Sequence, residues 1–118
     1  MALTIKEIPD SRQYLGNSCI LVSYTLAPGT SDYPNPGGYV IQAASLGLGH
    51  IWGADVEGVN QTVLTNSHEY FMVLAQTSPA SPGLTSVALQ AFVLTTGAQV
   101  ANGANLTGEI VVGQFYGY

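Results

Sequence analysis

Short runs of alternating apolar and polar residues, separated by glycine, proline and asparagine, most limit how this chain folds. In the run from Cys19 to Leu26, every second residue is large and apolar, namely Ile20, Val22, Tyr24 and Leu26. A period of two residues is that of a half-buried β-strand, because successive side chains of a strand point to opposite faces. We therefore expect a strand here, within a fold built from strands rather than long helices.

Several other segments have the composition of strands. They are residues 39–41, 50–56, 59–64, 69–76, 86–95 and 109–115. Gly58 is expected to separate 50–56 from 59–64. The segment 69–76 is apolar on both faces, which favours a central strand covered on each side, with a neighbouring subunit as a candidate for the second cover. One helical turn is predicted over 42–46, ended by Gly47 in the left-handed conformation.

Clusters of turn-forming residues lie between the strand candidates. Residues 28–38 contain three prolines and three glycines, and 78–83 contain two prolines and one glycine, so both are expected to be long loops. Asn66-Ser67 and Asn102-Gly103 are expected to form tight turns.

The predicted fold is all-β, in a single domain. The chain has 118 residues with 47% hydrophobic content, enough for one core. We expect a β-sandwich or jelly-roll-like barrel of about seven short strands over residues 18–118. Residues 1–17, which are rich in charge and turn formers, are expected to form an N-terminal arm or edge segment.

Both positive charges of the chain, Lys6 and Arg12, lie in its first dozen residues, and residues 13–118 contain no Lys or Arg. Charged residues make up 8% of the chain, against roughly 25% in an average soluble domain. Phosphate binding, nucleic-acid binding and polybasic membrane attachment all require cations that this body lacks. Such a body suits permanent contact with another protein, and we expect neither a nucleic-acid nor a membrane partner.

The N-terminal segment lacks the basic and long apolar regions of a secretion signal, and no stretch is apolar enough for a membrane span. We therefore expect a soluble, unprocessed chain. Cys19 is the only cysteine, so no disulfide can form within the chain.

Few residues of the sequence suit catalysis or metal binding. His68 and Glu69 are adjacent, so on a strand they would point to opposite faces. Asp55 and Glu57 would share a strand face roughly 7 Å apart, which is a separation that a glycosidase pair can use. Two acids on one strand face are more often solvated surface, so we expect no catalytic residue, no metal site and no cofactor.

Aromatic residues are the best candidates for contacts. Those considered as a sugar-stacking platform or as interface anchors are Tyr33, Tyr39, Trp52, Tyr70, Tyr116 and Tyr118. The final Phe115-Tyr116-Gly117-Tyr118 is the most interface-like of these, because such a tail packs on its own core or on a neighbour.

The sequence contains three blocks rich in turn-forming residues. They are Met1–Arg12 with Gly16-Asn17, then Tyr33-Pro34 with Gly37-Gly38 and the turn Ala43–Leu48, and finally Ala101-Asn102-Gly103 with Asn105-Leu106-Thr107. Together they resemble a family of small tailed-bacteriophage proteins encoded among the head genes. The segment 59–95 departs from that family, which has a Trp/Tyr-Asp turn and a basic strand there. The matching residues are turn formers, so no functional residue is carried over.

The resemblance implies a virion structural protein, in particular a capsid decoration or cement protein on the outer head lattice. Its partner would then be the major capsid protein. The protein would form a homo-oligomer, favoured as a trimer. It would be made in the bacterial host cytoplasm and located on the capsid exterior. Candidate interface residues are Lys6, Arg12, Tyr33, Tyr116 and Tyr118.

Two other functions remain open from the sequence. The first is a phage tail or fibre-associated module that binds a glycan through its aromatic residues. The second is a small hydrolase that uses Asp55 and Glu57.

Overall fold

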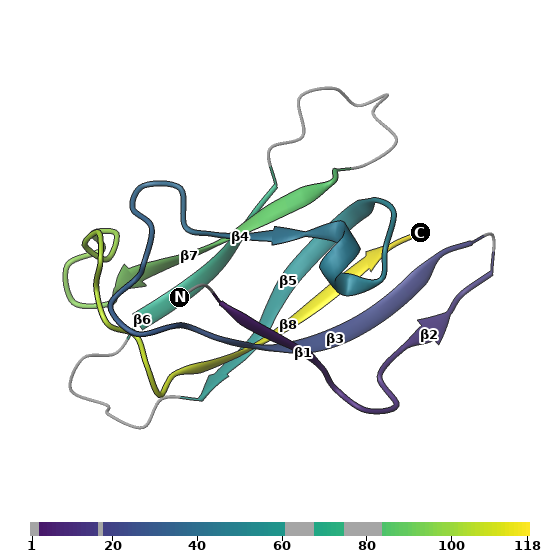
Figure 1. Cartoon of the computed structure of the whole chain (residues 1–118), viewed down its shortest axis with the longest axis horizontal. Helices are drawn as coiled ribbons and strands as arrows, with labels where there is room; N and C mark the ends of the chain where they lie inside the picture. The colour runs from purple at the N-terminus through teal and green to yellow at the C-terminus, as the bar shows by residue number, and fades with distance from the viewer. Residues whose placement is uncertain (1–2, 17, 61–67, 75–83) are drawn as a thin grey trace.

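The computed structural model describes residues 3–16, 18–60, 68–74 and 84–118, which form two antiparallel β-sheets (Figure 1). The first sheet has the order β1-β3-β8-β5, with β2 also paired to β3, and the second has the order β4-β7-β6. The strands are β1 (Thr4–Glu7), β2 (Gln13–Tyr14), β3 (Ile20–Ala27), β4 (Tyr39–Gln42), β5 (Ile51–Asn60), β6 (His68–Val73), β7 (Ser86–Val93) and β8 (Ile110–Gly117). The prediction of an all-β, sandwich-like fold is confirmed.

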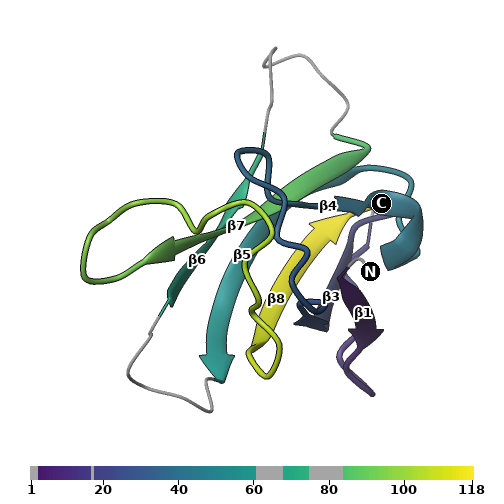
Figure 2. The same cartoon turned by 60° about the vertical axis from the view of Figure 1, so that its left-hand side comes forward.

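The core lies between the two sheets. Figure 2 shows β5, β8, β3 and β1 side by side, with β7 and β4 in a second layer. Val22, Tyr24 and Leu26 of β3 are buried, as the period of two residues predicts. Other fully buried side chains come from both sheets and from the loops between them: Tyr33, Ile41, Leu46, Ile51, Leu89, Leu106, Val111 and Phe115.

Between β4 and β5 lies a single 3₁₀ turn, η1 (Ala43–Leu46). Gly47 follows it with φ 69°, in the left-handed conformation. Its N–H donates to the carbonyl groups of the turn, which closes it. Both the helical turn and its glycine stop are confirmed.

β5 differs from the prediction in continuity and in register. It runs through Gly58 as one strand, paired throughout with β8, because β-bulges absorb the irregular residues. One bulge lies between Ile51 and Gly53 and another between Val56 and Gly58. The alternation of residues 50–56 predicts Trp52 on the same face as Ala54 and Val56, but because of the first bulge Trp52 is exposed, whereas Ile51 is buried and Ala54 and Val56 pack against the core.

β6 is an edge strand and not the central strand expected from its apolar composition. Tyr70 faces the core, whereas Phe71 and Val73 are exposed on the outer face. Strand composition reports how apolar a strand's two faces are, but it does not report how many neighbours the strand pairs with. The central strand of this sheet is β7.

The N-terminal segment is an edge of the first sheet. Four residues of β1 pair with β3, from Thr4 opposite Ala27 to Glu7 opposite Tyr24, and β2 pairs with the beginning of β3. Of the remaining predictions, the strand over 61–64, the turn 66–67, the end of the strand over 69–76 and the loop 78–83 lie outside the described residues.

Candidate functional site

The outer face of the β4-β7-β6 sheet is apolar. Its exposed residues include Val40 on β4 and Phe71 and Val73 on β6, and the Phe71 and Phe92 rings pack edge to face with centroids 5.6 Å apart. Val40 is 59% exposed. Within the strand residues described, Glu69 is the only charged side chain on this face. The face therefore presents apolar area that water solvates poorly.

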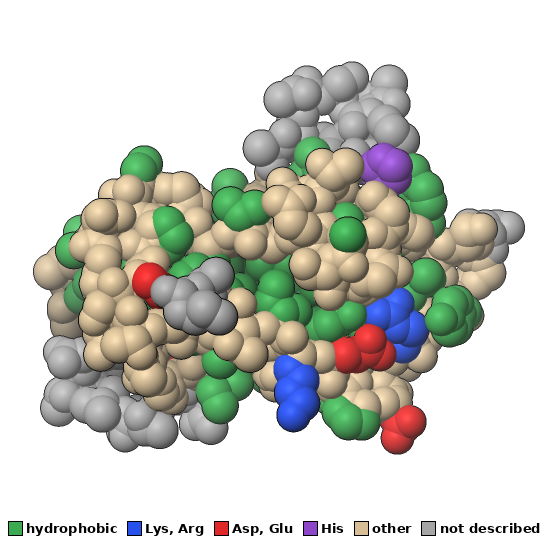
Figure 3. Space-filling view, in the orientation of Figure 1, with side chains coloured by type: hydrophobic (Ala, Val, Ile, Leu, Met, Phe, Trp, Pro, Cys, Tyr) green, Lys and Arg blue, Asp and Glu red, His purple; other side chains and the backbone are tan. Residues whose placement is uncertain are grey.

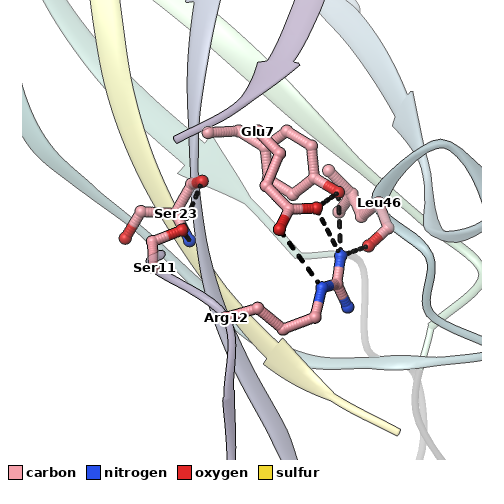
Figure 4. A network of polar contacts seen from close by, with 6 residues as sticks. Glu7, Ser11, Arg12, Ser23 and Leu46 are labelled. Carbon is pink, nitrogen blue, oxygen red and sulfur yellow. Dashed lines mark hydrogen bonds and ion pairs between the residues drawn. The ribbon is translucent and has the colours of Figure 1, made fainter. Parts of the chain in front are cut away.

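Charged side chains gather instead at the N-terminal edge of the first sheet. Figure 3 shows Lys and Arg side chains together with acidic ones around β1 and β2, while most of the rest of that view is uncharged. Arg12 donates from Nη2 to Glu7 Oε1 at 2.9 Å and to the Leu46 carbonyl oxygen at 2.9 Å (Figure 4). It also donates to the Tyr24 hydroxyl at 3.1 Å. One guanidinium thus joins the segment between β1 and β2 to η1.

These contacts change the expected role of Arg12. Its side chain is 20% exposed and is bonded within its own fold, so the interface role proposed for Arg12 competes with this network. The hydrogen bond from Arg12 holds the pKa of the Glu7 carboxyl below its ordinary value. Lys6, by contrast, is exposed on β1.

Replacing Arg12 by methionine is expected to lower the free energy of unfolding by about 1–2 kcal/mol at neutral pH, because hydrogen bonds that join distant segments are lost. A carboxyl with a lowered pKa contributes stability above its unfolded pKa and loses it as the pH falls through its folded pKa. The difference between wild type and Arg12→Met should therefore shrink in acid, once Glu7 is protonated.

Urea unfolding at neutral and acid pH measures both effects of Arg12→Met. Lys6→Met is the matched control, because it removes the other cation from an exposed position and should leave the midpoint unchanged. Equal midpoints for Arg12→Met and wild type at neutral pH would show that the network adds nothing to stability.

Tyr33 was proposed as an interface residue, and the structure corrects this. Its side chain is 1% exposed and lies in the core. The hydroxyl accepts hydrogen bonds from the Ala91 backbone N–H at 3.0 Å and from Gln99 Nε2 at 2.7 Å. The ring packs edge to face on Tyr39, with centroids 5.6 Å apart. A side chain already enclosed by its own chain is not available to a partner.

Three of the candidate aromatic residues, Trp52, Tyr116 and Tyr118, form a cluster with His50 at one end of the first sheet. His50 stacks on Tyr118 with centroids 4.9 Å apart, and Trp52 lies 5.1 Å from Tyr118 and 6.5 Å from Tyr116. Tyr116 is 44% exposed. A Cβ atom on Gly53 would lie 2.2 Å from the Tyr116 ring, so this glycine allows the ring to lie against β5. Interface roles for Tyr116 and Tyr118 remain predictions.

A groove lies beside this cluster, between the edge strands β5 and β6. One hollow, of about 340 Å³, is lined by Ala54, Asp55, Val56, Glu69, Tyr70, Phe71 and Met72. An adjoining hollow, of about 280 Å³, is lined by Gly53, Ala54, Asp55, Leu74, Gln114 and Tyr116. Ala54 and Asp55 line both, so the two form one groove along β5.

The two acids of the hydrolase hypothesis are not brought together in this groove. Asp55 lines it, but Glu57 lies in the bulge between Val56 and Gly58 and is not among the lining residues. The second acid of the groove is Glu69, which comes from the other sheet. Sequence spacing did not indicate this pair, because the two residues belong to different strands.

A largely buried polar cluster connects the two sheets, and one of its members, Tyr70, also lines the groove. His68 Nδ1 lies 2.7 Å from Glu109 Oε2, and the Tyr70 hydroxyl donates to Glu109 Oε1. Burial, and then the bond to Glu109, raises the pKa of the Tyr70 phenol, which therefore stays protonated as a donor. His68 thus pairs with a residue far along the chain. The cluster fastens β6 to the start of β8.

The described residues contain no group of three or more His, Cys, Asp or Glu side chains placed to share a metal ion. Over the same part of the chain, we find no helix with the length and apolarity needed to cross a bilayer.

No family model, curated protein or solved structure matches this chain. The function is therefore argued from the surfaces described above.

Proposed function

We propose that this protein is a structural subunit of a virion, a capsid decoration or cement protein that binds the outer lattice of a phage head. The observation that carries the proposal is the apolar outer face of the β4-β7-β6 sheet, centred on Val40, Phe71 and Val73. Burying apolar area against a capsid subunit stabilises a complex without ion pairs, so binding tolerates changes in salt. This property suits a protein that holds a lattice together.

The rest of the molecule is compatible with this role. Both sheets share one buried core, so the body can transmit load between contacts as a rigid unit.

The partner proposed is the major capsid protein, and a homo-oligomer, favoured as a trimer, would match a three-fold position of the lattice. The proposed location is the capsid exterior, after synthesis in the bacterial host cytoplasm. Light scattering on the purified protein tests the oligomer.

The direct test uses capsids that lack this protein. Added protein should bind them and raise their resistance to heat and chaotropes. Val40→Glu places a charge on the apolar face at an exposed position, and it should weaken capsid binding at least about tenfold, since an unpaired charge in an interface costs more than 1.4 kcal/mol.

Thr4→Glu is the matched control for Val40→Glu. It adds the same charge at an exposed position on β1, in the other sheet, and should leave capsid binding unchanged. If Thr4→Glu abolishes binding and Val40→Glu does not, the contact surface is the first sheet. If the wild-type protein neither binds the capsids nor stabilises them, the cement function is wrong.

A further inference from the structure

The groove between β5 and β6 has the features of a ligand site, and it adjoins the apolar sheet face at Phe71, which belongs to both. Its two hollows, of about 340 and 280 Å³, adjoin at Asp55. Their volumes are comparable to small-molecule sites, which begin at roughly 300 Å³. Both walls are formed mainly by strands of the scaffold, so the lining residues are held in place by the sheets.

Polar side chains in the groove can bond several hydroxyl groups at once. Asp55 pairs with Gln114 across β5 and β8, so a carboxylate and an amide lie side by side on one face. Glu69 adds a second carboxylate from β6. Carboxylates accept hydrogen bonds, and an amide both donates and accepts, which matches the donor and acceptor character of neighbouring hydroxyls.

Aromatic rings supply the apolar part of the site. Tyr116 lies against Gly53, two residues along β8 from Gln114, so its ring is roughly 7 Å from the polar pair. Trp52 packs edge to face against Tyr116 and helps to fix its position. Phe71 lines the groove from the other strand. A flat, exposed ring beside polar groups can hold the C–H face of a sugar ring while its hydroxyls reach the polar groups.

The charge of the groove limits its ligands. Residues 13–118 contain no Lys or Arg, and both cations lie on the opposite side of the first sheet, near β1. With two carboxylates and no cation, the groove repels phosphate, sulfate and acidic sugars.

The width of the groove argues against an added peptide strand. A strand inserted between two others holds them roughly 9.5 Å apart, twice the spacing of paired strands. Cα atoms of β5 and β6 approach within 8 Å of each other, so the gap is too narrow for backbone pairing on both sides. An extended basic peptide could still lie over the carboxylates, and the test must separate it from a sugar.

We propose that this groove binds an uncharged carbohydrate, with one pyranose ring stacked on Tyr116 and its hydroxyls bonded to Asp55, Gln114 and Glu69. The groove shares Phe71 with the apolar face proposed to contact a capsid, whereas Asp55, Gln114 and Tyr116 belong to the first sheet, and Val40 lies on β4 at the other edge of the apolar face.

Titration of the folded protein with methyl glycosides of glucose, galactose, mannose and N-acetylglucosamine, followed by amide chemical shifts, tests the site. At least one glycoside should shift the amides of Gly53, Asp55 and Gln114, with a dissociation constant of roughly millimolar, as for a shallow exposed site. Tyr116→Ala should weaken this binding about tenfold, whereas Tyr116→Phe, which keeps the ring, should stay within about twofold.

Salt and charge variants distinguish a sugar from a basic peptide. Binding of an uncharged glycoside should not depend on salt, and Val40→Glu should leave it intact even where capsid binding is lost. A tetra-arginine peptide is the competing probe. Its binding would weaken with salt and with Asp55→Asn, and if only this peptide shifts the groove amides, the carbohydrate proposal is overturned.

Two further results would overturn the proposal. One is the absence of shifts at the groove with every glycoside at tens of millimolar, and the other is equal affinity of wild type and Tyr116→Ala. If Tyr116→Ala lowers the unfolding midpoint, Gln114→Ala is used as the test variant for glycoside binding. Gln114→Ala removes an amide from the same wall of the groove and keeps the Tyr116 ring.

Discussion

Gly117→Ala is expected to lower the free energy of unfolding by at least about 3 kcal/mol. A Cβ atom at this position would lie 1.9 Å from the carbonyl oxygen of His50 and 3.0 Å from its carbonyl carbon. Both are backbone atoms of the neighbouring segment, so no side-chain rotation relieves the overlap. Gly117 also pairs with Ile20 on β3 and Ile51 on β5, and the strands must separate at this end of the sheet.

Urea unfolding followed by the fluorescence of Trp52, the only tryptophan, measures this loss. Trp52 packs on Tyr116 and Tyr118, on either side of Gly117, so its emission should also change in the folded variant. Gly58→Ala is the matched control, since it changes a glycine of β5 whose added Cβ would meet no atom within 4 Å. A Gly117→Ala midpoint equal to that of Gly58→Ala would contradict the close approach of β8 to His50.

Tyr33→Ala is expected to cost about 3–5 kcal/mol of unfolding free energy, in the range of large aromatic truncations in protein cores. Tyr33 is almost fully buried and its ring packs on Tyr39. Tyr33 belongs to the loop 28–38, and its hydroxyl accepts a hydrogen bond from the backbone of Ala91 on β7. The cavity left by alanine would therefore lie between this loop and β7.

Tyr33→Phe separates the ring from the hydroxyl. It keeps the packing but leaves the Ala91 N–H without its acceptor, so it should cost about 1–2 kcal/mol. Thermal unfolding of the isolated protein measures both variants. If Tyr33 acted at an interface, as its sequence context had indicated, neither change would alter the stability of the isolated chain, and unchanged midpoints would contradict the core position.

Local sequence patterns correctly predicted those elements of the fold that depend on only a few neighbouring residues. The alternation in 19–26 identified β3 and its buried face, and the glycine after residues 42–46 identified the end of η1. Such features depend on the period of a strand and on the backbone freedom of glycine, which act over a few residues. They do not depend on which strand pairs with which.

Register and pairing were predicted less well. The bulge at Trp52 reverses the face of the next residues, and an alternating sequence contains no sign of an inserted position. β6 was expected at the centre of a sheet because it is apolar on both faces, yet it lies at an edge with Phe71 exposed. The sequence does not distinguish apolar residues on an exposed outer face of a sheet from apolar residues that pack on a second layer.

The candidate sites depend on contacts between distant parts of the chain. Asp55 and Glu69 meet only because the edges of two different sheets lie side by side, and His68 meets Glu109 across 41 residues. Arg12, which was expected to contact a partner, donates to the Leu46 carbonyl 34 residues away. No short spacing in the sequence can report such pairs.

The sequence alone determined that the chain is all-β, which face of β3 is buried, and that both cations lie in the N-terminal segment. These follow from composition and from the two-residue period of a strand. The tertiary structure decided which strands form sheet edges, that Tyr33 belongs to the core, and that a groove opens beside Tyr116. The reason is that strand order and register are set by packing between segments far apart in the chain, which local periodicity does not encode.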